Sequence, residues 1–251
     1  MRKILYIVIT ALLSGLPPAA SGAPRMDWKW SNPQPTGNNL IHVEFQDPEH
    51  GLIVADNGEV SETDDAGETW KSRGGHIEAD YLISAVALDS RTLVSISGFG
   101  RVWRSTDRGV TWVIAATFKK TLMQIRSCGD DVLLAVGMDG STVIRSADRG
   151  ATWSEVLGDA DGPYLIGLHC ADGYAFAVGD SGTVLRSRDK GLHWESMPHP
   201  LRGVLTAVAF SDSSHGMATT ERGRIAKTQD GGRTWKVTLL DSMNYLGGIY
   251  R

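Results

Sequence analysis

Short apolar segments alternate with polar turns along most of the chain, and their lengths predict β-strands. Residues 164–187, YLIGLHCADGYAFAVGDSGTVLRS, contain three apolar runs that are separated by Ala-Asp-Gly and by Gly-Asp-Ser-Gly. Runs of four to eight residues bounded by Gly, Asp and Ser are typical of strands joined by tight turns. No segment after residue 23 has a helical period, so we predict an all-β fold.

An eight-residue phrase punctuates this pattern five times. Its copies are TDDAGETW (63–70), STDRGVTW (105–112), SADRGATW (146–153), SRDKGLHW (187–194) and TQDGGRTW (228–235). Each copy keeps a hydroxyl, an Asp, a Gly and a Trp at fixed offsets, and the tryptophans follow one another at steps of 42, 41, 41 and 41 residues. The repeated residues are Thr63, Asp65, Gly67, Trp70, Ser105, Asp107, Gly109, Trp112, Ser146, Asp148, Gly150, Trp153, Ser187, Asp189, Gly191, Trp194, Thr228, Asp230, Gly232 and Trp235.

A period near forty residues with strand-like content predicts a β-propeller. Three apolar runs and a strand that begins at the Trp make four antiparallel strands per unit, which is one propeller blade. We predict one propeller domain over residues 24–251 with about five complete blades. Partial strands at residues 28–33 and 245–251 extend the repeat without completing a blade, so the predicted shape is a tight five-bladed ring or an open arc. Open edges would invite self-association or a partner strand.

The phrase has the chemistry of a turn. The hydroxyl and the Asp accept hydrogen bonds from nearby backbone N–H groups, the Gly permits a positive φ, and the Trp covers the hairpin with its ring. Five copies distributed around a propeller cannot converge on one catalytic centre. We therefore interpret the phrase as a structural fastener.

The N-terminus and the charge indicate export. Arg2 and Lys3 precede an apolar run and then small residues, the layout of a signal peptide over residues 1–23. The chain has a net charge of −4, and removal of these two cations leaves about −6, which argues against nucleic acid as a partner. No Cys directly follows the apolar run. We expect a periplasmic or secreted protein that has no lipid anchor and no transmembrane segment in its mature part.

The pattern S/T-x-D-x-G-x-T-W is that of the Asp-box, or BNR repeat, of sialidases and related propellers. Together with the strings HGLIVADNGEVSETDDAGETW and HGMATTERGRIAKTQDGGRTW, it resembles the photosystem II stability/assembly factor family and its bacterial relatives over roughly residues 28–251. The resemblance implies an exported, non-enzymatic seven-bladed propeller that binds partner proteins during assembly of a membrane complex. The chain departs from the family in its length, in its lack of the anchor of cyanobacterial members, and in His193, which replaces the Thr of the fourth box.

The search for an active site favours a binding protein. The chain contains no HExxH, GxSxG, P-loop or CxxC motif, and we predict no catalytic residue, cofactor or metal. Residues 158–162, GDADG, resemble the start of a calcium loop, but Cys170 stands where the closing Glu would be. The alternative function is a carbohydrate-active Asp-box protein, either a sialidase-like glycosidase or a lectin-like binder, although the F/Y-R-I-P signature of sialidases is absent.

Two inner-strand columns and one cationic column of the repeat suggest binding residues. Counting back from each Trp aligns Arg126 with Val43, Ala85, Gly167 and Val208, and aligns His169 with Phe45, Ala87, Cys128 and Phe210. Arg126 is interpreted either as part of an internal ion pair, with Glu44 or Asp130, or as part of a binding site at the mouth of the central channel. The cationic column directly precedes the box and holds Arg104, Arg145, Arg186 and Lys227, with Glu62 in the first unit. It predicts either contacts between blades or a basic ledge for an acidic protein surface or lipid headgroups.

Cys128 and Cys170 are the only cysteines of the chain, and the repeat places them on neighbouring inner strands. Their aligned offsets differ by one residue, which favours opposite faces. Two outcomes stay open, a disulfide in an exported chain or two buried thiols.

Overall fold

The computed structural model describes residues 36–239, apart from 79, 130 and 199–201. Over these residues the chain forms five four-stranded antiparallel sheets, each made of consecutive strands, and the only helix is the short η1 (Asp180–Gly182). The prediction of an all-β propeller with four-stranded blades is confirmed. No helix among the described residues is long and apolar enough to cross a membrane.

The five sheets are blades 1 to 5 in chain order. Blade 1 contains β1 (Leu40–Phe45), β2 (Gly51–Ala55), β3 (Val60–Thr63) and β4 (Lys71–Gly74). Blade 2 contains β5 (Leu82–Ala87), β6 (Leu93–Ser97), β7 (Arg101–Ser105) and β8 (Val113–Thr117). Blade 3 contains β9 (Leu122–Ser127), β10 (Leu133–Gly137), β11 (Ser141–Ser146) and β12 (Ser154–Asp159). Blade 4 contains β13 (Leu165–Ala171), β14 (Tyr174–Gly179), β15 (Val184–Ser187) and β16 (Glu195–Ser196), and blade 5 contains β17 (Leu205–Phe210), β18 (Gly216–Thr220), β19 (Arg224–Thr228) and β20 (Lys236–Leu239).

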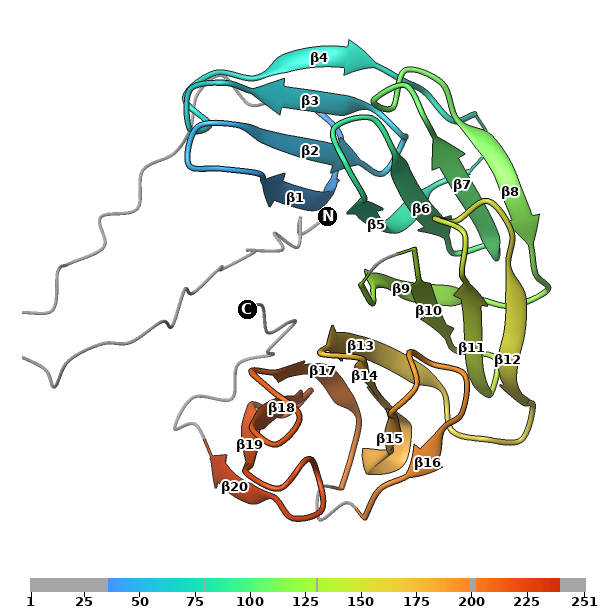
Figure 1. The fold of residues 1–251 in the computed structure, drawn as a ribbon, viewed down its shortest axis with the longest axis vertical. Helices are drawn as coiled ribbons and strands as arrows, with labels where there is room; N and C mark the ends of the chain where they lie inside the picture. The colour runs from blue at the N-terminus through green and yellow to red at the C-terminus, as the bar shows by residue number, and fades with distance from the viewer. Residues whose placement is uncertain (1–35, 79, 130, 199–201, 240–251) are drawn as a thin grey trace, which may run out of the picture.

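The described blades form an open arc, with blade 1 and blade 5 at its two ends (Figure 1). The first strands β1, β5, β9, β13 and β17 lie on the inner side of the arc, and each of the first four contacts the first strand of the next blade. The fourth strands lie on the outer side. The signal peptide and the partial strands predicted at residues 28–33 and 245–251 lie outside the described residues.

The hydrophobic core lies between neighbouring blades rather than inside a single one. The second strands of blades 1 to 3 are buried along their whole length, which fits the apolar runs of β2 and β10, while β6 also buries Ser95 and Ser97. Between blades 4 and 5, Phe176 and Phe210 stack with ring centroids 3.5 Å apart, and Trp235 packs edge-on against Phe210 at 6.2 Å. Each blade therefore depends on its neighbour for burial, as expected of repeat proteins.

Candidate functional site

The five Asp-boxes close the turns between the third and fourth strands by the same set of hydrogen bonds. In blade 3, Ser146 Oγ accepts from Gly150 N–H at 2.9 Å and donates to Asp148 at 2.8 Å. Asp148 also accepts from Thr152, through its backbone N–H at 2.9 Å and its hydroxyl at 2.6 Å. The corresponding bonds recur in the boxes that begin at Thr63, Ser105, Ser187 and Thr228.

Two consecutive residues of each box adopt left-handed backbone conformations. In blade 3 these are Arg149 at φ 59° and Gly150 at φ 80°. A Cβ on Gly150 would lie 2.8 Å from Cγ2 of Val94 in blade 2, so the Gly is required both by its backbone and by the close approach of the neighbouring blade. The preceding left-handed residue was not anticipated from the sequence, because four of the five copies carry a side chain there.

The fourth box replaces the usual Thr by His193 without losing the turn. His193 N–H donates to Asp189 at 2.9 Å, and its Nδ1 lies 2.6 Å from the other carboxylate oxygen. The imidazole thus takes the place of the Thr hydroxyl. The backbone hydrogen bond from His193 is the main cause that holds the pKa of Asp189 well below its usual value, and the hydrogen bond from the His193 imidazole is the second.

Hydrogen bonds inside the boxes lower the pKa of the Asp carboxyl groups. The hydroxyl and the backbone N–H of Thr69 are the main causes that bring the pKa of Asp65 to about 2, and Thr234 does the same for Asp230, also to about 2. Donors that stabilise the charged form of a carboxyl group lower its pKa.

We expect the stability of the protein to fall in acid as the boxes protonate. The pKa values of Asp65 and Asp230 are lower in the folded state, about 2, than the 3.8 of an unperturbed Asp. Their contribution is therefore fully present above pH about 4 and is lost as the pH falls toward about 2. Urea midpoints should be nearly constant from about pH 7 to 5 and decline below about 4. The Asp230→Asn variant should show a shallower decline, and an equally steep one would contradict this origin.

The boxes serve as fasteners at separate places on the arc. They lie at the turns between β3 and β4, β7 and β8, β11 and β12, β15 and β16, and β19 and β20, which Figure 1 shows on five different blades. The indole N–H groups of Trp153, Trp194 and Trp235 each donate to the Gly carbonyl of their own box at 3.1 Å. Trp112 instead reaches across to the carbonyl of Gly58 in blade 1 at 3.0 Å.

Three arginines of the cationic column bind the next blade. Nε of Arg104 donates to the carbonyl of Arg149 at 3.0 Å, and Nε of Arg145 donates to that of Lys190 at 2.9 Å. Arg186 donates through NH1 to the carbonyl of Gly231 at 3.0 Å and also holds Glu195 at 2.7 Å. Each acceptor is the residue just before the box Gly. Arg104, Arg145 and Arg186 therefore make contacts between blades, which is one of the two roles that the sequence suggested for this column.

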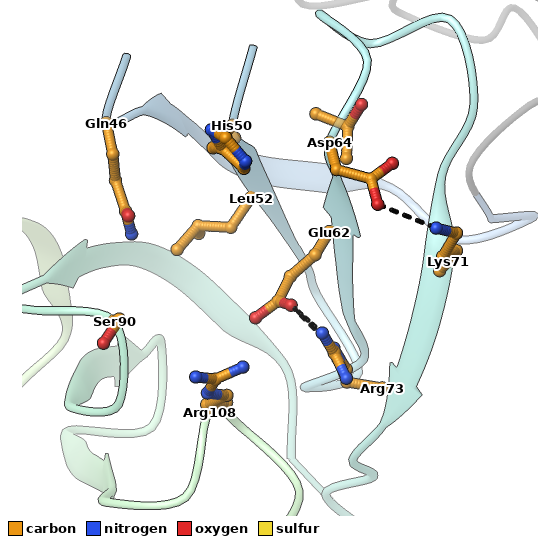
Figure 2. A pocket seen from close by; sticks show the side chains of 11 residues that line it. Gln46, His50, Leu52, Glu62, Asp64, Lys71, Arg73, Ser90 and Arg108 are labelled. Carbon is orange, nitrogen blue, oxygen red and sulfur yellow. Dashed lines mark hydrogen bonds and ion pairs between the residues drawn. The ribbon is translucent and has the colours of Figure 1, made fainter.

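The junction between blades 1 and 2 lacks this arginine. Glu62 holds the position on β3 and bonds to Arg73 on β4, with a shortest distance of 2.5 Å. At the other end of the column, Lys227 is exposed on β19. A cavity of about 380 Å³ lies at the junction between blades 1 and 2. Figure 2 shows Glu62 and Arg108 pointing into it from opposite sides, with the second ion pair, Lys71 with Asp64, on its rim. We call this cavity the junction pocket.

Strand pairing corrects the alignment of Arg126 and His169. Arg126 pairs with Leu134, His169 with Phe176, and Glu44 with Leu52. Each of these second-strand residues pairs in turn with the third-strand residue that directly precedes the box. Glu44, Arg126 and His169 therefore share one level of the inner strands, with Val86 and Ala209. The column of Arg126 and the column of His169, which counting from the Trp kept apart, are therefore one column.

These inner-strand residues have local contacts. NH1 of Arg126 donates to the carbonyl of Ile125 at 3.0 Å, and Nε2 of His169 lies 3.0 Å from the carbonyl of Phe210 in blade 5. Glu44 contacts His42 at 3.2 Å rather than Arg126. Asp130, the other partner suggested for Arg126, lies outside the described residues.

Cys128 and Cys170 form a disulfide between blades 3 and 4, with a Cα–Cα distance of 5.0 Å. The expectation that their side chains point to opposite faces is wrong. Cys128 lies one residue beyond β9, at the start of a turn, where the alternation of strand side chains no longer applies. A smaller cavity of about 290 Å³ lies beside the disulfide.

The described residues contain no cluster of three or more His, Cys, Asp or Glu side chains arranged to hold a metal ion. The acidic stretch 158–162 includes the end of β12 and a turn in which Asp161 N–H donates to Asp159 at 3.2 Å.

The fold and its boxes define an Asp-box β-propeller, and comparisons with known proteins agree. Residues 23–115 match the family model "Photosynthesis system II assembly factor YCF48". The photosystem II assembly lipoprotein Ycf48 of Synechococcus sp. (strain CC9902) is 25% identical over 169 residues, which are 63% of this chain and 48% of that protein. The chain is thus a BNR-repeat propeller that resembles the photosystem II assembly factors, and the match spans about half the length of its curated relative.

Two solved GH74 enzymes share the fold. An ancestral GH74 enzyme superimposes with a TM-score of 0.67 and 16% identity, covering 84% of this chain and 32% of that chain. The GH74 xyloglucanase of Xanthomonas campestris superimposes with a TM-score of 0.62 and 18% identity, covering 81% of this chain and 39% of the enzyme. At such identities the likeness establishes the fold and leaves the activity open.

Proposed function

We propose that the protein is an exported, non-enzymatic binding scaffold that assists assembly or stability of a membrane complex by binding a protein partner. The observation that carries the proposal is the similarity to the photosystem II assembly factors, in the family model and over 169 residues of the Synechococcus protein. The local geometry supports it, because the box residues are engaged in closing their own turns, as Ser146 and Asp148 illustrate. The partner of this chain is proposed by class only, as a protein of a membrane complex.

The carbohydrate-active alternative has the fold in its favour through the GH74 enzymes. The junction pocket offers two carboxylates, but Glu62 is bonded to Arg73 and Asp64 to Lys71. A general acid or nucleophile must be able to reach a substrate and exchange a proton or a bond with it. We therefore prefer the binding function.

The test of this function is capture of the native partner from the exporting cell. The mature chain, immobilised and incubated with periplasmic and detergent-solubilised membrane fractions, should retain subunits of one membrane complex. The native protein itself should be found in the periplasmic or secreted fraction. Hydrolysis of, or saturable binding to, a glycan, with no retained protein, would overturn the proposal in favour of the carbohydrate alternative.

We expect the Arg126→Ala variant to retain less partner while remaining folded. Arg126 is half-buried on the inner strand β9, where it pairs with Leu134 through its backbone, so removal of its side chain leaves the strand pairing intact. Loss of one charge-assisted contact weakens binding by roughly tenfold. The matched control is Arg188→Ala, which removes an exposed arginine of the outer turn. A fall in melting temperature with unchanged capture would instead assign Arg126 a structural role.

A further inference from the structure

The junction of blades 1 and 2 lacks the hydrogen bond from an arginine to the next box that is present at the other three described junctions. Comparison with those junctions shows which contacts its residues have lost. At the junction of blades 2 and 3, Arg104 binds the carbonyl of Arg149, and the Arg149 guanidinium pairs with Asp89 of blade 2 and, at 3.7 Å, with Asp131 of its own blade. Arg108 is the counterpart of Arg149 in the second box. Its surroundings can therefore be compared position by position.

Both anionic partners of Arg149 are lost at Arg108. The backbone N–H of Arg149 donates to the carbonyl of Asp131, and that of Arg108 donates to the carbonyl of Arg91, each at 2.9 Å. Arg91 thus holds the position of Asp131, so a cation replaces a carboxylate.

The other lost partner is the counterpart of Asp89, which is Asp47 in blade 1. Both side chains accept from the backbone N–H groups two and three residues later, Asp89 from Arg91 and Thr92, and Asp47 from Glu49 and His50. In blade 1, however, the carboxylate is held by the His50 ring, whose Nδ1 lies 2.9 Å from both oxygens of Asp47. The hydrogen bond to Asp47 raises the pKa of His50, which favours the charged pair.

The Arg108 guanidinium consequently has no hydrogen bond or ion pair within the part of the chain that the structure describes. It projects into the junction pocket, where Glu62 faces it but is bonded to Arg73 at 2.6 Å through Nε (Figure 2). Lys71 and His50 also line the pocket. The other cations are matched by carboxylates, Lys71 by Asp64 and His50 by Asp47. An unpaired guanidinium attracts a carboxylate, and its planar fork binds one through two parallel hydrogen bonds.

We propose that the junction pocket binds an acidic side chain, Asp or Glu, from a protein partner, with Arg108 as the principal binding residue. The ligand carboxylate takes the place that Asp89 and Asp131 take at Arg149. The inference rests on the proposed binding function and adds to it the chemistry of the bound segment and the residue that recognises it.

The test is an NMR titration of the mature protein with the probe N-acetyl-Ala-Glu-Ala-amide, and with its Gln counterpart as the neutral control. The Nε–H signal of Arg108, assigned by its loss in Arg108→Gln, should move progressively with the Glu peptide at millimolar concentration. The signal of Arg149, whose carboxylate partners are internal, should stay in place. The Gln peptide should leave both signals unchanged.

The Arg108→Gln variant supplies a second readout, the backbone amide signal of His50 on the opposite wall. Its shift with the Glu peptide should require roughly tenfold more peptide in the variant than in the parent protein. Because the Arg108 side chain makes no hydrogen bond or ion pair among the described residues, the variant should keep the dispersed spectrum of the folded parent. Equal shifts with the Glu and Gln peptides, or no shift of Arg108, would overturn the site. If the membrane partner is still captured in that case, the proposed function stands and only this site falls.

Discussion

Removal of the Cys128–Cys170 disulfide should lower the free energy of unfolding by about 4 kcal/mol. The bridge closes a loop of 42 residues, and the loss of loop-closure entropy from the unfolded chain gives roughly this value for a loop of that length. The bridge also joins blades 3 and 4, whose shared core, including Leu134 and Leu168, depends on their remaining together. A large effect on stability is therefore expected from the loss of a single covalent link between two blades.

Urea unfolding of the double variant Cys128→Ala/Cys170→Ala, with and without dithiothreitol, measures this effect. The parent protein should unfold at a lower urea concentration when reduced, and the double variant should unfold at one midpoint under both conditions. Ser127→Ala, next to the bridge and exposed, is the matched control and should behave like the parent. A parent protein whose midpoint is indifferent to reduction would show that the bridge does not stabilise the fold.

The blades could be predicted from the sequence because their signal is local and repeated. Each box carries its own hydrogen-bond donors and acceptors within eight residues, as Ser146, Asp148 and Thr152 show. The apolar runs between boxes have the length of single strands, and a period near forty residues leaves room for four of them. Strand order within a blade follows directly, since short turns join antiparallel neighbours.

The alignment of individual inner-strand residues could not be predicted by counting back from each Trp, because one turn in blade 3 and one in blade 4 differ in length from those of the other blades. Leu134 pairs with Arg145, eleven residues on, whereas Val94 pairs with Arg104, ten residues on. Blade 3 thus has one extra residue in the turn between its second and third strands. Blade 4 has one residue fewer between its first and second strands, where Cys170 pairs with Ala175. The two changes shift Arg126 and His169 in opposite directions, which is why counting placed them in different columns.

The candidate site depended on contacts between blades, which a single repeat does not encode. The sequence showed that Glu62 breaks a cationic column, but the column's role became visible only when Arg104, Arg145 and Arg186 were seen to bind the following box. The unpaired state of Arg108 likewise depends on Asp47 being held by His50, two groups in another blade. Residues of this kind are recognised by comparing equivalent junctions in space.

Substitution of Arg186 should destabilise the protein more than substitution of any other residue in the cationic column. Its side chain is 5% exposed and makes hydrogen bonds to Glu195 through Nε at 2.8 Å and to the carbonyl of Gly231 through NH1 at 3.0 Å. The same guanidinium is the main cause that lowers the pKa of Glu195. In Arg186→Met the stem is kept and the charge is lost, which leaves the buried carbonyl of Gly231 without this donor and the Glu195 carboxylate with Arg188 as its remaining cation. The expected loss is about 2–3 kcal/mol of unfolding free energy.

Comparison with Arg145→Met and Arg188→Met separates this effect from a general loss of charge. Arg145 makes one hydrogen bond to the next blade, so its substitution should cost about 1 kcal/mol. Arg188 pairs with the same Glu195 from an exposed position, 53% accessible, and its loss should change stability by less than about 0.5 kcal/mol. Urea unfolding at pH 7 gives all three values. Equal losses for Arg186 and Arg188 would mean that the pair with Glu195, and not the bond to the box of blade 5, sets the contribution, and the junction would then be held by its apolar core alone.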